Sequence, residues 1–156
     1  MGGQLIHVQF GQKKIRELVF DFVTDKFKSP SLLTLSEHLT EENFLMDAAY
    51  QQEPDSIIWV VRDDGMLLAL TYQEDENVIG WSQHPTTGEV ESISVIPRPS
   101  TGKDWLWASI QRTINDVTET FIEQMEPDAD LDREWHSLQT DCASIVTPDA
   151  DLLVSG

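Results

Sequence analysis

The sequence predicts a mainly β protein made of antiparallel meanders, and one stretch, Pro54–His84, carries most of that prediction. Two apolar runs rich in β-branched and aromatic residues, Ser56–Arg62 and Met66–Gln73, are joined by Asp63-Asp64-Gly65. An Asp-Gly pair favours a hairpin turn because glycine adopts a positive φ without steric cost. A polar loop at residues 74–77 leads to a third strand, Val78–His84. Residue preference, turn chemistry and strand length agree on a β-meander.

Two strands are predicted before this meander, Leu5–Phe10 and Ile15–Phe22, with a turn at residues 11–14 between them. In the second strand Leu18, Phe20 and Phe22 occupy alternate positions. Because alternate side chains of a strand share one face, we expect these three to face the core.

One short helix is predicted between residues 30 and 40. Ser29 is a suitable N-cap and Pro30 suits the first helical position, where its missing N–H costs nothing. Leucines then recur at helical spacing, at Leu32, Leu35 and Leu39. The stretch Leu45–Tyr50 fits a strand or a helix, and we favour a strand.

After the meander, the alternation of Glu89–Ile96 predicts another strand, and Pro97–Gly102 reads as a rigid polar loop. A further hairpin is predicted from Trp105–Ile114 and Val117–Met125, around the turn Asn115-Asp116.

Three strand–turn–strand units recur about every 50 residues, a spacing found in propeller blades. They are Ile6–Phe22, Ile58–Tyr72 and Leu106–Ile122. The pattern predicts about two to three propeller-like blades, with an ordinary antiparallel sandwich as the alternative. We expect a β domain over residues 1–126 and a partly ordered acidic extension over residues 127–156.

The charge is strongly negative: 28 acidic and 10 basic residues give −18 over 156 residues. Such a surface repels phosphate, which argues against nucleic-acid binding through a basic patch, although acidity also simply confers solubility. Half of the basic residues lie between Lys13 and Lys28, where we expect them to pair with carboxylates of this chain or of a neighbouring subunit. A single cysteine, Cys142, excludes an internal disulfide framework. No apolar run is long enough to predict a membrane span, and no secretion leader is recognised.

Candidate metal sites are weak. Asp128, Asp130 and Asp132 resemble the start of a calcium loop, but Arg133 and Gln139 stand where that loop needs glycine and glutamate. His84 lies near Glu89 and Glu91 and could join a metal site, but polar residues at strand ends are ordinarily solvated. His38 beside Glu37 has no HExxH partner, and His136 with Cys142 lacks a second Cys/His pair. We therefore predict no catalytic residue, no metal ligand and no cofactor, and hence no enzyme.

Four tryptophans, Trp59, Trp81, Trp105 and Trp107, fit either a sugar-binding face or packing within and between sheets. We favour packing. The predicted core consists of Ile58, Trp59, Val61, Leu68, Leu70, Ile79 and Trp81.

The chain resembles a block shared by the tail tubular protein B, or tail nozzle, family of short-tailed bacteriophages, also described as phage stabilisation proteins. The resemblance runs from about Gly11 to Met125, and more weakly through Leu131–Cys142. Its most distinctive part is Tyr50–His84, which contains AYQQEPDS followed by DDG and LTY. The turn that usually reads Asn-Gly in this family is Asn115-Asp116 here.

This resemblance implies a propeller-like β region and a non-catalytic role in the virion tail, assembled in the bacterial cytoplasm. The implied partners are copies of the chain or other tail and portal proteins, around a tube through which DNA passes without specific binding, and no membrane. An acidic channel wall would let the duplex slide because it forms no counterion-releasing contacts with phosphate. The alternative function is a β module that binds carbohydrate or a host surface.

Overall fold

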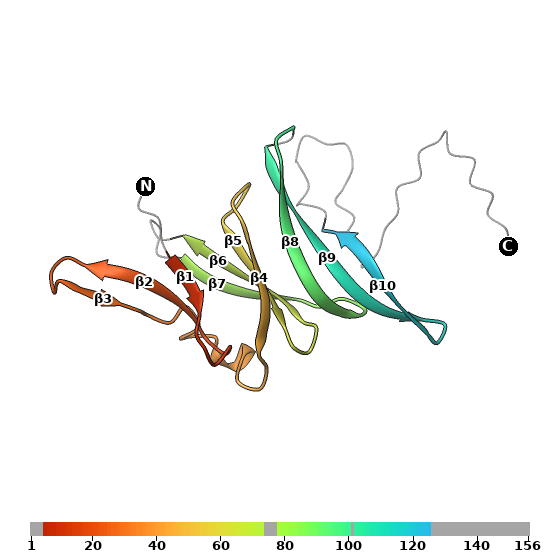
Figure 1. Ribbon diagram of the computed structural model, residues 1–156, viewed down its shortest axis with the longest axis horizontal. Helices are drawn as coiled ribbons and strands as arrows, with labels where there is room; N and C mark the ends of the chain where they lie inside the picture. Colours follow the sequence, from red (N-terminus) through yellow and green to blue (C-terminus); the bar gives the residue numbers. More distant parts are fainter. Residues whose placement is uncertain (1–4, 74–77, 101, 126–156) are drawn as a thin grey trace. The chain divides into compact units, whose positions relative to one another are not determined.

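A computed structural model describes residues 5–73, 78–100 and 102–125, in which ten strands form three antiparallel sheets (Figure 1). The first sheet has the order β1 (Leu5–Val8), β2 (Ile15–Asp21), β3 (Lys26–Lys28). The second has the order β4 (Leu45–Gln51), β5 (Ile57–Arg62), β6 (Leu67–Gln73), β7 (Val78–His84). The third has the order β8 (Glu89–Arg98), β9 (Lys103–Ile114), β10 (Val117–Gln124). The prediction of a mainly β fold is confirmed.

Each predicted repeat forms a hairpin, and the three hairpins lie in three different sheets: β1–β2, β5–β6 and β9–β10. None of these sheets closes on itself within the described ranges. The number of propeller-like blades therefore stays a prediction, as does the extension at residues 127–156, which lies outside the described residues.

The second sheet is covered on both faces. Its first core cluster contains Ile58, Val60, Leu68 and Leu70, packed with Ile15 of β2, with Leu32, Leu33 and Leu39 from the segment after β3, and with Leu45. Its second core cluster contains Trp59, Val61, Leu67 and Ala69, packed with Val90, Leu106, Ala108 and Ile110 of the third sheet. A strand buried on both faces needs apolar residues at consecutive positions, which explains the unbroken runs in β5 and β6.

The tight turns follow the predicted chemistry. Gly65 has φ +76° and closes the β5–β6 hairpin. Asn115 and Asp116 have φ 51° and 64°, and Ile114 pairs with Val117 across them. Two consecutive positive φ values are typical of the two-residue turn whose twist matches that of the flanking strands.

The predicted orientation of β2 is wrong. Leu18, Phe20 and the following Phe22 share one face as expected, but Phe22 is 88% exposed and Leu18 is exposed as well. The opposite face is buried at Ile15 and Glu17, and Ile15 joins the first core cluster. Strand alternation identifies which side chains go together, but only the neighbouring elements decide which of the two faces is covered.

The predicted helix is reduced to the 3-10 turn η1 (Glu37–Leu39). The backbone at the expected helix start pairs with β2 instead: the Glu17 N–H donates to the Pro30 carbonyl at 3.2 Å, and the Leu32 N–H donates to the Ile15 carbonyl at 2.9 Å. These tertiary hydrogen bonds use groups that a helix would need. Leu32 and Leu39 are buried as expected, whereas Leu35 is 94% exposed.

Two smaller predictions also change. Pro97 and Arg98 belong to β8 rather than to a loop, and Pro97 is tolerated because β8 is an edge strand, where a missing N–H is harmless. Ile79 is exposed rather than buried because it lies on the edge strand β7. The predicted strand at Leu45–Tyr50 is confirmed as β4.

Across the described part of the chain, no helix has the length and apolar character needed to cross a membrane.

Candidate functional site

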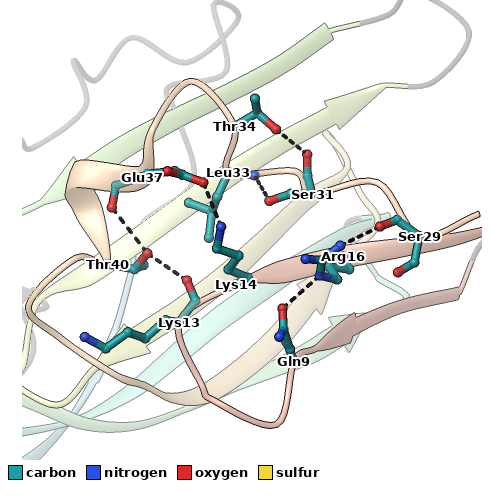
Figure 2. Close-up of polar contacts among 10 residues, drawn as sticks. All are labelled: Gln9, Lys13, Lys14, Arg16, Ser29, Ser31, Leu33, Thr34, Glu37 and Thr40. Atoms are coloured by element: carbon teal, nitrogen blue, oxygen red, sulfur yellow. Dashed lines mark hydrogen bonds and ion pairs between the residues drawn. The ribbon is translucent and has the colours of Figure 1, made fainter.

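The basic side chains of Lys13, Lys14 and Arg16 form contacts with other residues of the same chain (Figure 2). Lys14 Nζ lies 2.8 Å from Glu37 Oε1, and this pairing lowers the pKa of the Glu37 carboxyl. Arg16 donates to Gln9 Oε1 at 2.8 Å and to the Ser29 carbonyl at 2.7 Å. Lys13 donates to the Glu41 carbonyl at 2.6 Å. These side chains hold residues 29–41 against the first sheet.

Lys28, one of the two lysines of β3, forms an ion pair with Asp21. This contact lowers the pKa of the Asp21 carboxyl. The expectation that basic residues of this segment pair with carboxylates is thus confirmed within the chain for Lys14 and Lys28.

His84, the histidine considered for a metal site, packs against a tryptophan. Its ring centroid lies 5.1 Å from that of Trp59, and its Nε2 lies 3.0 Å from Ser82 Oγ. Burial lowers the pKa of the imidazole below its usual 6.5. Glu91 instead accepts a hydrogen bond from Ser109 Oγ at 3.2 Å.

No group of three or more histidine, cysteine or acidic side chains is arranged to hold a metal ion within residues 5–73, 78–100 and 102–125. Asp128, Asp130, Asp132, His136 and Cys142 lie outside those ranges. His38 is exposed on η1.

Two shallow hollows have few ionisable side chains in their lining. One of about 440 Å³ is lined by residues of β1, the following turn and β4, and its ionisable side chain is Asp47. The Asp47 carboxylate accepts hydrogen bonds from the Ala48 and Ile93 N–H groups at 2.8 and 3.0 Å, so it joins β4 to β8. A second hollow of about 190 Å³ is lined by Ile79, Trp81 and residues 31, 32 and 34–36, without an ionisable side chain.

The four tryptophans divide into two pairs. Trp59 is buried and donates to Gln51 Oε1 at 2.8 Å, and Trp81 packs on the first core cluster and donates to the Leu32 carbonyl at 2.9 Å. These two indoles stabilise the core, as predicted. Trp105 and Trp107 are partly buried and belong to neither core cluster.

The second pair of tryptophans lies on the outer face of the third sheet. Leu106, Ala108 and Ile110 point to the second core cluster, so the alternating Trp105 and Trp107 point away from it. Register adds two exposed neighbours on this outer side: Ile96 opposite Trp105, and Ile122 opposite Ser109. We call Ile96, Trp105, Trp107 and Ile122 the tryptophan face.

The first sheet has an equivalent uncovered face. Leu5 pairs with Leu18, and Phe20 pairs with Phe27, so all four lie on the side away from Ile15. Phe20 also contacts Phe22 and Phe27 edge-on, with ring centroids 5.0 and 5.1 Å apart. Phe22 and Phe27 are 88% and 68% exposed. We call Leu5, Leu18, Phe20, Phe22 and Phe27 the phenylalanine face.

Sequence reasoning recognised some residues of both faces but assigned them to other roles. Phe20 and Phe22 were expected in the core, and Phe27 was not identified because a strand as short as β3 gives no periodic signal. The available signals were the apolar residues at alternate positions of β2 and the two tryptophans at alternate positions of β9. They could not show that the corresponding faces are uncovered.

No protein-family model matches the chain, and no curated protein shows significant sequence similarity to it.

Proposed function

We propose that this protein is a non-catalytic structural subunit that assembles through its β-sheets, in the manner of the phage tail tube or nozzle proteins that its sequence resembles. The observation that carries the proposal is the pair of apolar sheet faces, on the first and third sheets, that the described part of the chain leaves uncovered. Exposed apolar patches of this kind are typical of protein–protein contacts.

The polar chemistry supports a structural role. Several side chains of the types that enzymes use as acids, bases or ligands join elements here: Asp47 links β4 to β8, and Asp104 Oδ2 accepts from the Gln52 and Glu53 N–H groups at 2.8 and 3.0 Å. Arg112 of β9 forms a bidentate ion pair with Glu123 of β10. Each contact holds a strand rather than presenting a reactive group.

The charge fits a tail component placed around DNA. A chain with −18 net charge repels phosphate, so a channel built from it would let DNA pass without holding it. In this proposal the partners are further copies of the chain or other tail and portal proteins, and the location is the virion tail.

Light scattering after size exclusion tests the proposal. A ring-sized mass, together with no binding of duplex DNA at low salt, is the expected result. A single-chain mass at every concentration, or tight DNA binding, would contradict it.

The alternative is a carbohydrate-binding module, favoured by the tryptophan face. Trp107 pairs with Ser94 on one side and with Gln124 on the other, which places hydroxyl and amide groups beside an indole. However, the Arg98 guanidinium lies 4.0 Å from the Trp105 ring centroid and covers one side of that ring. Saturable quenching of tryptophan fluorescence by a polysaccharide, abolished by Trp107→Ala, would support this alternative over assembly.

A further inference from the structure

We propose that the phenylalanine face of one copy packs on the tryptophan face of a second copy, in a head-to-tail contact. This inference deepens the proposed assembly function and rests on it. It specifies both surfaces, the partner and the symmetry of the contact.

The layering of the sheets provides the first reason. The second sheet is covered on one side by Ile15 and residues 32–39, and on the other side by the third sheet. Among residues 5–73, 78–100 and 102–125, the first and third sheets each use one face for these contacts, and no described element covers the other face. Packing one uncovered face on the other would continue the same sheet-on-sheet arrangement, at the usual spacing of about 10 Å, from one copy into the next.

The size of the apolar surface provides the second reason. A phenylalanine carries about 150–250 Å² of surface, so Phe22 and Phe27 together leave roughly 300 Å² exposed. Leu5, at 56% exposed, and Leu18 extend this area. The tryptophan face contributes Ile96 and Ile122, which are 51% and 70% exposed. A contact between the faces would bury this apolar surface on both partners, and it would need the surrounding polar side chains and backbone as well to reach the roughly 800 Å² per partner of a stable interface.

The charges favour unlike faces over two like ones. The side of the first sheet that carries the phenylalanine face also carries Arg16, which pairs with His7, and no carboxylate among its strand positions. Two such faces packed together would place two guanidinium groups in one interface without a carboxylate. On the outer side of the third sheet, Glu91 accepts from Ser109 and Thr120 and supplies a carboxylate, and Arg98 on the same side lies over the Trp105 ring. A head-to-tail contact brings Arg16 and Glu91 into one interface and also covers both faces.

Complementation between two blocked variants tests the contact in the full chain. Phe22→Glu blocks the phenylalanine face and Ile122→Glu blocks the tryptophan face, and both side chains are exposed enough for the fold to survive. Each variant alone is expected to have a single-chain mass, with association weakened about tenfold or more. An equimolar mixture of the two is expected to form a two-chain species, because each variant retains the face that the other lacks. Leu35→Glu, a charge-matched change at an exposed apolar residue outside both faces, should assemble like the wild type, and so should Phe22→Leu.

Several outcomes would overturn the inference. A mixture that stays at single-chain mass, or self-association of Ile122→Glu alone, would exclude head-to-tail packing. Wild-type-like assembly of both blocked variants would place the interface elsewhere and leave the proposed assembly function intact, whereas a wild-type protein that stays monomeric would exclude both. If the two variants complement each other but the wild type forms open chains instead of rings, the contact would be supported and the tail-tube role contradicted. Circular dichroism and thermal melting establish that each variant is folded.

Discussion

The indole N–H of Trp59 donates a 2.8 Å hydrogen bond to Oε1 of Gln51, and both side chains are more than nine-tenths buried. Gln51 lies at the end of β4 and Trp59 lies within β5, so this bond joins two paired strands beneath the second core cluster. Breaking a buried hydrogen bond of this kind is costly because neither partner can form a replacement hydrogen bond with water.

Because removing one partner leaves the other unsatisfied, replacing both should cost less than the sum of the two single replacements. We expect Trp59→Phe to lower the free energy of unfolding by about 1–3 kcal/mol, since the Gln51 carbonyl oxygen loses its donor. Gln51→Leu should have a similar effect, and the double variant should lose less than the sum of the two. Denaturant unfolding of the three variants measures the coupling. Additive losses would show that the hydrogen bond contributes no coupling energy.

The two core tryptophans should differ in their tolerance of truncation. Trp59→Ala should cost about 3–5 kcal/mol because it leaves a cavity in a closed cluster. Trp81→Ala should cost less, because Trp81 is only partly buried and lines an open hollow. Thermal melting of both variants compares them, and equal losses would contradict this difference in burial.

Arg112 and Glu123 form a second pair whose members depend on each other. Arg112 is 7% exposed, and its Nε and Nη2 donate to the two carboxylate oxygens of Glu123 at 2.7 and 2.9 Å. It also donates to Thr86 Oγ1 at 2.9 Å and to the Thr87 carbonyl. Glu123→Ala should destabilise the protein by about 3 kcal/mol, because it removes the carboxylate that accepts two hydrogen bonds from a buried guanidinium.

The matched test removes the cation as well. Arg112→Met combined with Glu123→Leu should recover much of the stability lost by Glu123→Ala, since no buried charge then remains. Urea unfolding compares the single and double variants. A double variant that is less stable than Glu123→Ala would indicate that the contacts to Thr86 and Thr87 matter more than the ion pair.

Gly65 and Gly102 provide a comparison of two glycines with similar backbone angles. Both have positive φ, +76° and +65°. A Cβ at Gly65 would lie 2.6 Å from Glu89 Cβ and 2.7 Å from Glu89 Cα, whereas a Cβ at Gly102 would meet no atom within 4 Å. We expect Gly102→Ala to cost about 1 kcal/mol for the left-handed conformation alone.

Gly65→Ala should cost clearly more than Gly102→Ala, because it also pushes β8 away from the β5–β6 turn. The Val90 N–H donates to the Gly65 carbonyl at 3.0 Å, so this hydrogen bond would be weakened too. Equilibrium unfolding of both alanine variants tests the difference. Equal losses would contradict the close approach between the turn and β8.

The stability of the protein should decrease in mildly acidic solution through His84. Because burial holds the pKa of this imidazole below 6.5, the unfolded chain takes up the proton more readily than the folded one. The contribution of His84 is therefore fully present above about pH 6.5 and is lost as the pH falls toward the folded pKa.

Unfolding free energies measured from about pH 7.5 to about pH 5 test this dependence. His84→Gln should flatten the profile in that range. An unchanged profile in His84→Gln would assign the pH dependence to other groups.

Self-association should strengthen with salt. Two copies that each carry −18 repel one another, and the contact proposed between them is mainly apolar. Raising sodium chloride from about 0.1 M to about 1 M shortens the screening length from about 10 Å to about 3 Å and reduces this repulsion. Sedimentation should show a larger mass at high salt for the wild type and an unchanged mass for Phe22→Glu. Dissociation at high salt would indicate a contact held by ion pairs instead.

Much of the local structure could be read from the sequence. The strands β4–β7, the turn at Gly65 and the hairpin around Asn115-Asp116 follow from residue preference and turn chemistry within a few neighbouring positions. The unbroken apolar runs of β5 and β6 also predicted burial correctly at Ile58, Trp59, Val61, Leu68 and Leu70.

The exceptions share one cause. Residues 30–32 had helical signals but pair with β2, and Pro97 had a loop signal but extends an edge strand. In both cases hydrogen-bonding partners distant in sequence decide the conformation, and a local pattern contains no information about them.

By itself the sequence determined that the chain forms antiparallel ribbons, where most of them turn, and which side chains of a strand stay together, because these properties depend on neighbouring residues. Only the tertiary structure decided that Phe20 and Phe22 face away from the core, that Trp59 and Trp107 have different surroundings, and that two sheets each keep an uncovered face. The two faces of a strand are equivalent until another layer packs against one of them. The packing of the whole molecule therefore determines which face is buried.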